Sequence, residues 1–298
     1  GRLAAACAAV IALIAFGVWA FVIHPAKVAE QRTAALEAIV EKSASGNEID
    51  SDVMEFAITY PYASMNPVQQ KAVRDGMTDV MRQCYEHKNV GEKEKEAKSV
   101  CSILTDKYGS PEIWEACCSY AKAGYHIDHA HYDRAVEILH ELVKDGATDA
   151  GEHWDADALK IVEAARKAFR EYEKTRFTYA LNTALEIYMV LLPYSGEIRS
   201  VNVQEEAAEK YTAALVLAES MRSDKDWDSA ISVYTKLQTS GLADYLEKKT
   251  AEADHSDRED ADQSSGTSKM EALIKEAQYE HAEALFAEGS YKKAVTEY

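Results

Sequence analysis

The sequence predicts an all-α protein in which an N-terminal transmembrane helix precedes an array of helical hairpins. Three observations support this fold class. The chain of 298 residues has only 13 glycines and 5 prolines, too few turn formers for a β-sandwich or a glycine-looped α/β enzyme of this size. Its first part is a long uncharged apolar run, and the rest places small and apolar residues at helical spacing.

The charge balance limits the class of partner. Acidic residues number 51 and basic residues 33, which gives a formal net charge of −18. Such a chain offers no net positive field to gather phosphates, so nucleic acid and anionic lipid surfaces are excluded as main partners. We expect a protein or peptide partner, and the charge favours a basic one.

The apolar run at residues 3–23 is predicted to be a membrane anchor. It contains 21 residues without a charge, and these span about 31 Å as a helix, which matches the hydrocarbon core of a bilayer. Trp19 and Phe21 stand near its end, and Lys27 marks the exit into water. A cleaved signal peptide and a buried core helix are the alternatives.

The segment 24–200 reads as one helical domain with degenerate repeats. Ser51 or Asp52 is the expected N-cap of its second helix, and Gly109-Ser110-Pro111 joins a helical hairpin, with glycine just past one helix and proline opening the next. The periodicity predicts helices at 28–42, 53–59, 67–87, 92–108, 111–124, 132–145 and, with at least one break, 154–192.

The remaining sequence holds two hairpins separated by a polar segment. Helices are expected at 203–222, 226–239 and 268–288, with a last one starting near Tyr291. Residues 246–269 are rich in acids, serines and small residues and almost lack apolar ones after Leu246. We interpret them as an acidic polar linker or the frayed end of a helix.

A spaced pattern of small and large residues recurs in both hairpins. Small residues stand where two helices would meet, and large ones lie between them. Segment 203–245 carries it as Tyr211, Ala214, Leu217, Trp227, Ala230 and Tyr234. Segment 270–298 carries it as Tyr279, Ala282, Leu285, Gly289, Tyr291, Ala294 and Tyr298. The first tyrosines are 68 residues apart, twice the 34-residue period of tetratricopeptide repeats. An irregular helical bundle is the alternative.

The stretch KEAQYEHAEALFAEGSYKKAVTEY at 275–298 resembles the tetratricopeptide-like hairpins of membrane-anchored proteins in Gram-positive bacteria. In that family a single transmembrane helix precedes the array, and a cytoplasmic zinc ribbon sometimes precedes the helix. The resemblance implies a binding or scaffolding role. We expect a cell-envelope scaffold that binds a protein or peptide partner, with its helical domain outside the cytoplasm, although the charges that flank the anchor nearly cancel and leave the cytoplasmic orientation open. It carries over no catalytic residue and no ligand.

One segment could instead bind a metal ion. Residues 125–133 include His126, Asp128, His129 and His131, whose imidazoles and carboxylate are common zinc ligands. The separated ligand pairs of structural zinc sites and the helical His-Glu-x-x-His arrangement are both absent. A metal-binding sensor or hydrolase built on the His126–His131 turn is therefore an alternative function, and a polar loop between two helices is the simpler interpretation.

Sequence motifs of common enzymes are missing. The chain has no Gly-x-Gly-x-x-Gly, no phosphate loop and no Gly-x-Ser-x-Gly elbow. We therefore expect a non-enzymatic scaffold with no catalytic residues, cofactor or metal, and a structural spacer without a dedicated ligand is a further alternative. The cysteines on successive helices could be free buried thiols or could form one bridge, such as Cys84 to Cys101 or Cys117.

Overall fold

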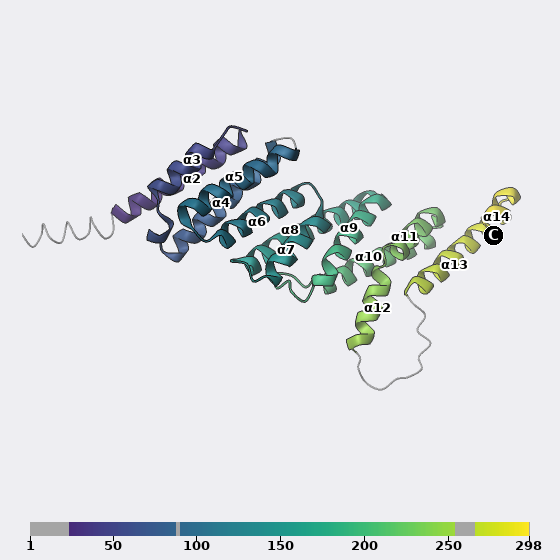
Figure 1. Cartoon of the computed structure of the whole chain (residues 1–298). Coiled ribbons are helices and arrows are strands. Elements are labelled where there is room, and N and C mark those ends of the chain that lie inside the picture. Colours follow the sequence, from purple (N-terminus) through teal and green to yellow (C-terminus); the bar gives the residue numbers. More distant parts are fainter. Residues whose placement is uncertain (1–23, 88–89, 254–265, 298) are drawn as a thin grey trace, which may run out of the picture. The chain divides into compact units, whose positions relative to one another are not determined.

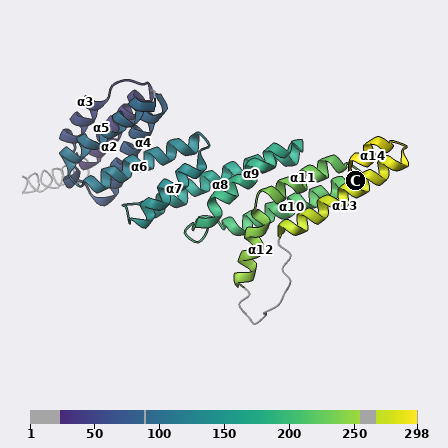
Figure 2. The same ribbon diagram turned by 45° about the vertical axis from the view of Figure 1, so that its right-hand side comes forward.

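A computed structural model describes residues 24–87, 90–253 and 266–297 (Figures 1 and 2). Within these ranges the regular elements are all helical, which confirms the all-α class predicted for this part of the chain. The α-helices are α2 (His24–Ala44), α3 (Asp50–Thr59), α4 (Pro67–His87), α5 (Val90–Tyr108), α6 (Pro111–Asp128), α7 (Tyr132–Lys144), α8 (Ala150–Thr175), α9 (Thr178–Leu191), α10 (Val203–Ser223), α11 (Trp227–Thr239), α12 (Leu242–Ala253), α13 (Gly266–Ala287) and α14 (Tyr291–Glu297). Short 3₁₀ turns, η2 (Tyr62–Ser64) and η3 (Leu192–Tyr194), follow α3 and α9.

The predicted membrane anchor at 3–23 lies outside the described residues. Among the helices that are described, none is both long and apolar enough to cross a bilayer.

Proline and glycine place several helix ends where the sequence predicts them. α4 begins at Pro67 and α6 at Pro111, because a proline in the first turn sacrifices no helical hydrogen bond. Gly109, which ends α5, has a φ of 75°, a conformation that costs glycine little. The break expected within 154–192 lies between α8 and α9, next to Arg176 with a φ of 62°.

The expected cap of α3 is wrong. This helix begins at Asp50, its N-cap is Ile49, and no side chain caps it, so neither Ser51 nor Asp52 holds that position. Ile49 is completely buried, as is Val53 one turn later. Burial of these two side chains fixes where the chain enters the helix, and local capping does not.

The predicted linker at 246–269 is helical at both of its ends, while residues 254–265 lie outside the described residues. α12 continues to Ala253, and α13 begins at Gly266. Leu242 and Ala243 are buried in the first turn of α12, and the Tyr245 hydroxyl donates a hydrogen bond to the carbonyl of Leu192 at 2.7 Å. Once this turn is anchored, the following Glu, Lys and Ala residues propagate the helix readily.

Contacts divide the chain into two compact units, with the boundary between Ala150 and Gly151. In the first unit, α4 packs against α2 on one side and α6 on the other, while α5 contacts α3, α4 and α6, and α7 packs on α6 (Figure 1). Large buried side chains, among them Met77, Leu104 and Trp114, fill the space between these helices.

An aromatic cluster closes the α5–α6 turn. The ring centroids of Tyr62, Tyr108 and Trp114 lie 5.3 to 5.6 Å apart, in the range of favourable aromatic pairs. The Trp114 indole donates to the carbonyl of Gly109 at 3.0 Å, and the Tyr108 hydroxyl donates to that of Tyr60 at 2.9 Å. These bonds satisfy the polar atoms of the buried rings and fix the hairpin.

The second unit is built from consecutive helices that pack in pairs. α10 packs on α11, α11 on α13 and α13 on α14, while α9 contacts α10 and α11, and α12 lies against α10, α11 and α13. Alanines line these contacts: Ala214, Ala230, Ala282 and Ala294 are at most 1% exposed. Small side chains let helix axes approach closely, which explains their position.

Candidate binding groove

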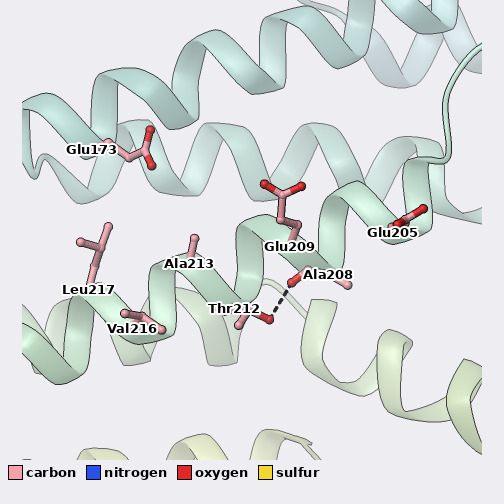
Figure 3. A pocket seen from close by; sticks show the side chains of 8 residues that line it. All are labelled: Glu173, Glu205, Ala208, Glu209, Thr212, Ala213, Val216 and Leu217. Carbon is pink, nitrogen blue, oxygen red and sulfur yellow. Dashed lines mark hydrogen bonds between the residues drawn. The ribbon is translucent and has the colours of Figure 1, made fainter.

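A groove of about 680 Å³ runs along one face of α10 in the second unit (Figure 3). Seven of its lining residues belong to α10, and the eighth, Glu173, comes from the last turn of α8. The lining consists of Glu173, Glu205, Ala208, Glu209, Thr212, Ala213, Val216 and Leu217.

Helical periodicity explains why α10 exposes this face. Ala207, Ala214 and Ala218 are buried on the side that packs into the unit, and the lining residues recur every three to four positions on the opposite side. The helix starts at Asn202, whose side-chain oxygen accepts from the backbone N–H of Glu205 at 3.2 Å. This cap places Glu205 in the first turn, where a carboxylate is favoured by the helix dipole.

The groove combines an apolar strip with carboxylates. Val216 is 63% exposed, and Ala208, Ala213 and Leu217 continue the apolar surface. The Thr212 hydroxyl donates to the carbonyl of Ala208 at 2.9 Å, as Figure 3 shows, so this polar group is satisfied within the helix. A side chain that covers Val216 would therefore displace water from hydrocarbon without breaking a bond to protein.

The charge of the lining is wholly negative. Glu173, Glu205 and Glu209 are exposed carboxylates, and none of the eight lining residues is basic. Lys210 lies beside this surface: its Nζ is 3.0 Å from Glu209 Oε1, and its side chain lines a neighbouring hollow. This surface therefore suits a cationic side chain next to an apolar one.

Arg166, which also lines the neighbouring hollow, is neutralised by a half-buried partner, Glu206. Its Nε and Nη2 donate to the two carboxylate oxygens of Glu206, each at 2.6 Å, and the Tyr188 hydroxyl donates to the same carboxylate at 2.8 Å. Burial alone would raise the pKa of Glu206, but the bonds from Arg166 and Tyr188 outweigh burial and lower it. Because Arg166 is bound to Glu206, it offsets little of the groove's negative charge.

The predicted repeat residues are distributed between core and surface. Ala214, Ala230, Tyr234, Ala282 and Ala294 are buried, while Tyr211, Leu217, Trp227 and Leu285 are half-buried. Tyr279 is 56% exposed, and Gly289 has a φ of 78° between α13 and α14. Tyr291 opens α14, and Tyr298 lies outside the described residues.

Of these repeat residues, Leu217 lines the groove. The hydroxyl of Tyr234 donates to Glu219 at 2.5 Å. Burial, aided by Glu247 and Asp244, raises the pKa of Tyr211 to about 12.

The histidines of the 126–133 turn are separated by the helix boundary. His126 is buried near the end of α6, His129 follows that helix, and His131 precedes α7. The ring centroids of His126 and His131 lie 5.7 Å apart, and His129 Nδ1 is 2.9 Å from the carbonyl oxygen of Tyr125. Within residues 24–87, 90–253 and 266–297, no three His, Cys, Asp or Glu side chains are grouped to hold a metal ion.

Among the described residues, the cysteines form no disulfide; they are Cys84, Cys101, Cys117 and Cys118. Cys84 and Cys117 are buried, and the Sγ of Cys84 donates to the carbonyl of Val80 at 3.3 Å. Cys101 and Cys118 are half-buried. The suggested bridges from Cys84 are therefore not formed in this structure.

Four groove residues were not predicted as site residues from the sequence: Glu173, Glu205, Glu209 and Val216. A helical wheel of 203–222 would have placed the last three opposite the buried alanines, so a local signal existed. Glu173 had no such signal, because it lies 32 positions before Glu205 and reaches the groove through tertiary packing.

Comparison of the chain with models of protein families, with curated proteins and with solved structures found no match.

Proposed function

We propose that this chain is a membrane-anchored helical-repeat scaffold that binds a basic protein segment in the groove on α10. The observation that carries the proposal is the combination of three exposed carboxylates, an exposed apolar strip and no basic residue in the lining. The anchor is the apolar run at 3–23, which would hold this groove near a membrane.

The pairing of helices supports a tetratricopeptide-like array. In the second unit each helix of the series α10, α11, α13 and α14 packs on the next, and the alanines of the sequence pattern are buried at these contacts. In such arrays the first helix of each hairpin lines a groove used for peptides. α10 has that position, since it opens the hairpin completed by α11.

The mechanism is a weak, salt-dependent association. Exposed ion pairs contribute only about 0.2–1 kcal/mol each, so three of them cannot give tight binding alone. Covering the apolar strip adds about 25 cal/mol for each Å² removed from water. We therefore expect a dissociation constant of about 1 µM to 1 mM, with charge deciding which partner binds.

The test measures binding of labelled peptides by fluorescence anisotropy. The probe is an unstructured peptide that alternates lysine or arginine with leucine, and its counterpart replaces each basic residue with glutamate. We expect the basic peptide alone to bind, and its affinity to fall steeply as salt rises, because exposed ion pairs are screened. Salt-independent binding, or equal binding of both peptides, would contradict the proposal.

A matched pair of triple variants separates the groove from the overall charge. The groove variant is Glu173→Gln/Glu205→Gln/Glu209→Gln, and the control variant is Glu112→Gln/Glu137→Gln/Glu141→Gln, at three exposed sites of the first unit. Both remove three negative charges. The groove variant should weaken binding at least about tenfold, since about 1.4 kcal/mol is lost, and the control should leave it unchanged. Equal losses would mean that only net charge matters, which favours a spacer without a dedicated ligand.

A further inference from the structure

A second hollow, in the first unit, brings two cysteines together. It has a volume of about 390 Å³ and is formed by α5 and α6 with Tyr85 from α4. Cys101 of α5 and Cys118 of α6 both line it, beside Lys98 and Lys122. The bridges suggested from the sequence, Cys84 to Cys101 or Cys117, do not include this pair.

The register of the hairpin places both cysteines at the same height. Cys101 stands seven residues before Tyr108, the last residue of α5, and Cys118 stands seven residues after Pro111, the first of α6. The two helices pack against each other and are joined by a two-residue turn, so they run antiparallel. Seven residues correspond to about 10.5 Å along each helix and nearly two full turns. The cysteines therefore stand at equal distances from the turn on the face towards the hollow.

The other two thiols point elsewhere. Cys84 bonds the carbonyl of Val80 within its own helix and lies 3.8 Å from the Ser43 hydroxyl. Cys117 is buried beside Thr78 of α4. Cys101 and Cys118 are half-buried and border a hollow large enough for a small oxidant.

We infer that Cys101 and Cys118 form a reversible disulfide when the protein meets a disulfide oxidant. The thiolate of one cysteine attacks a sulfur of the oxidant and displaces a thiolate, which leaves a mixed disulfide. The second cysteine then attacks that bond and releases the other half of the oxidant as a thiol. Two S–H bonds are broken and one S–S bond is formed, while two electrons and two protons pass to the oxidant.

The surroundings of the thiols set the rate. Burial raises the pKa of Cys101 to about 11, and burial also raises that of Cys118, although Lys98 and Lys122 oppose the second shift. Only the thiolate attacks, so oxidation is slow at neutral pH. While the pH stays below the lower thiol pKa, each unit by which the pH is raised makes oxidation about tenfold faster.

The test uses the full chain in detergent with all native cysteines. The protein is incubated with oxidised glutathione at pH 8.5, free thiols are alkylated under denaturing conditions, and unreduced tryptic peptides are mapped by mass spectrometry. We expect a linked pair of peptides containing Cys101 and Cys118, with Cys84 and Cys117 alkylated. A bridge involving Cys84 or Cys117, or glutathione adducts on Cys101 and Cys118 without a link, would overturn the inference.

Single variants provide the controls. In Cys118→Ser the mixed disulfide cannot resolve, so a stable glutathione adduct should accumulate on Cys101. In Cys117→Ser, the adjacent cysteine, the Cys101–Cys118 link should form as in the native chain. A link missing from Cys117→Ser while its helical circular dichroism is native would argue against the pair. The native-chain map decides the question by itself if either variant fails to fold.

Discussion

In the second unit, the carboxylate of Glu206 has a structural role. Its side chain is 12% exposed and is held by Arg166 and Tyr188. Removing one partner of such a network leaves the other polar groups without good hydrogen bonds. The resulting loss in the free energy of unfolding exceeds what the intact interaction contributes to it. Glu206 is therefore a structural group, whereas Glu205 and Glu209 on the same helix line the groove.

We predict that Glu206→Gln lowers the free energy of unfolding by about 1–3 kcal/mol at pH 7, because charge-assisted bonds to Arg166 are lost. The pKa of Glu206 is lowered in the folded state, so its contribution is present above the ordinary value of 4.5 and disappears as pH falls below it. The native chain and the variant should thus differ at pH 7, and this difference should shrink when the pH is lowered to about 3.

Urea unfolding followed by circular dichroism at both pH values measures this difference. Glu163→Gln is the matched control, since Glu163 binds the same arginine but is 51% exposed. Its effect should stay below about 1 kcal/mol. A Glu206→Gln difference that grows towards low pH would contradict the assigned charge state.

Gly76 in α4 lies where this helix packs closely against α2. A Cβ built there would lie 2.3 Å from Leu36 Cδ2 and 2.8 Å from its Cγ. We predict that Gly76→Ala destabilises α2 and α4 by about 1–3 kcal/mol, because the buried Leu36 side chain must move. In a Leu36→Ala background the sign should reverse, because alanine favours a helix interior over glycine by about 1 kcal/mol.

Hydrogen exchange of the α2 and α4 amides measures the local stability of the native chain, the two single variants and the double variant. Gly151→Ala serves as the control. Apart from its chain neighbours and the nearby backbone of its own helix, no atom lies within 4 Å of a Cβ added there. This substitution should leave those amides unchanged in both backgrounds. If Gly76→Ala cost the same with and without Leu36, the close contact would not be the cause.

Among the elements, α13 depends on tertiary bonds for its place. Arg222 at the end of α10 donates to both carboxylate oxygens of Glu280, at 2.9 and 2.6 Å, and to Glu276 at 3.2 Å. Arg222 is 18% exposed, so these bonds are shielded better than ordinary surface pairs. They tie α13 to a helix that precedes it by more than 40 positions.

We predict that Arg222→Gln speeds hydrogen exchange of α13 by about five- to thirtyfold, which corresponds to a loss of about 1–2 kcal/mol of local stability. Exchange in α8 and α9 should not change. Lys275→Gln is the control, because Lys275 forms an exposed pair with Glu271 within α13 and should have no measurable effect. Equal acceleration by both substitutions would mean that the bonds from Arg222 stabilise α13 no more than an exposed ion pair does.

For the whole molecule, the central prediction concerns the run at 3–23. The full chain should remain with membranes in alkaline carbonate, and Leu13→Arg should weaken insertion, since arginine at the centre of a membrane helix costs about 2.5–3.5 kcal/mol. With a cysteine at the exposed Ser45 of an otherwise cysteine-free chain, an impermeant thiol reagent should label intact cells. Labelling only after lysis would place the helical domain in the cytoplasm and contradict the predicted location outside it.

The sequence by itself determined the helical class and most helix ends. Hydrophobic periodicity is a local property of the sequence, and Pro67, Gly109 and Pro111 act only on the turns that contain them. Both signals can therefore be read without knowing how the helices pack. Local rules failed at α3, where buried Ile49 sets the helix start, and at α12, which extends through a polar sequence because its first turn is buried.

Only the tertiary structure decided which side chains share a site. It brings Glu173 to the groove on α10, assigns Glu206 to Arg166, and sets Cys101 level with Cys118. Each of these arrangements joins residues on different helices, and their relation depends on how the helices pack and in which register. Composition and local periodicity carry no information on that packing, because many packings satisfy the same apolar faces.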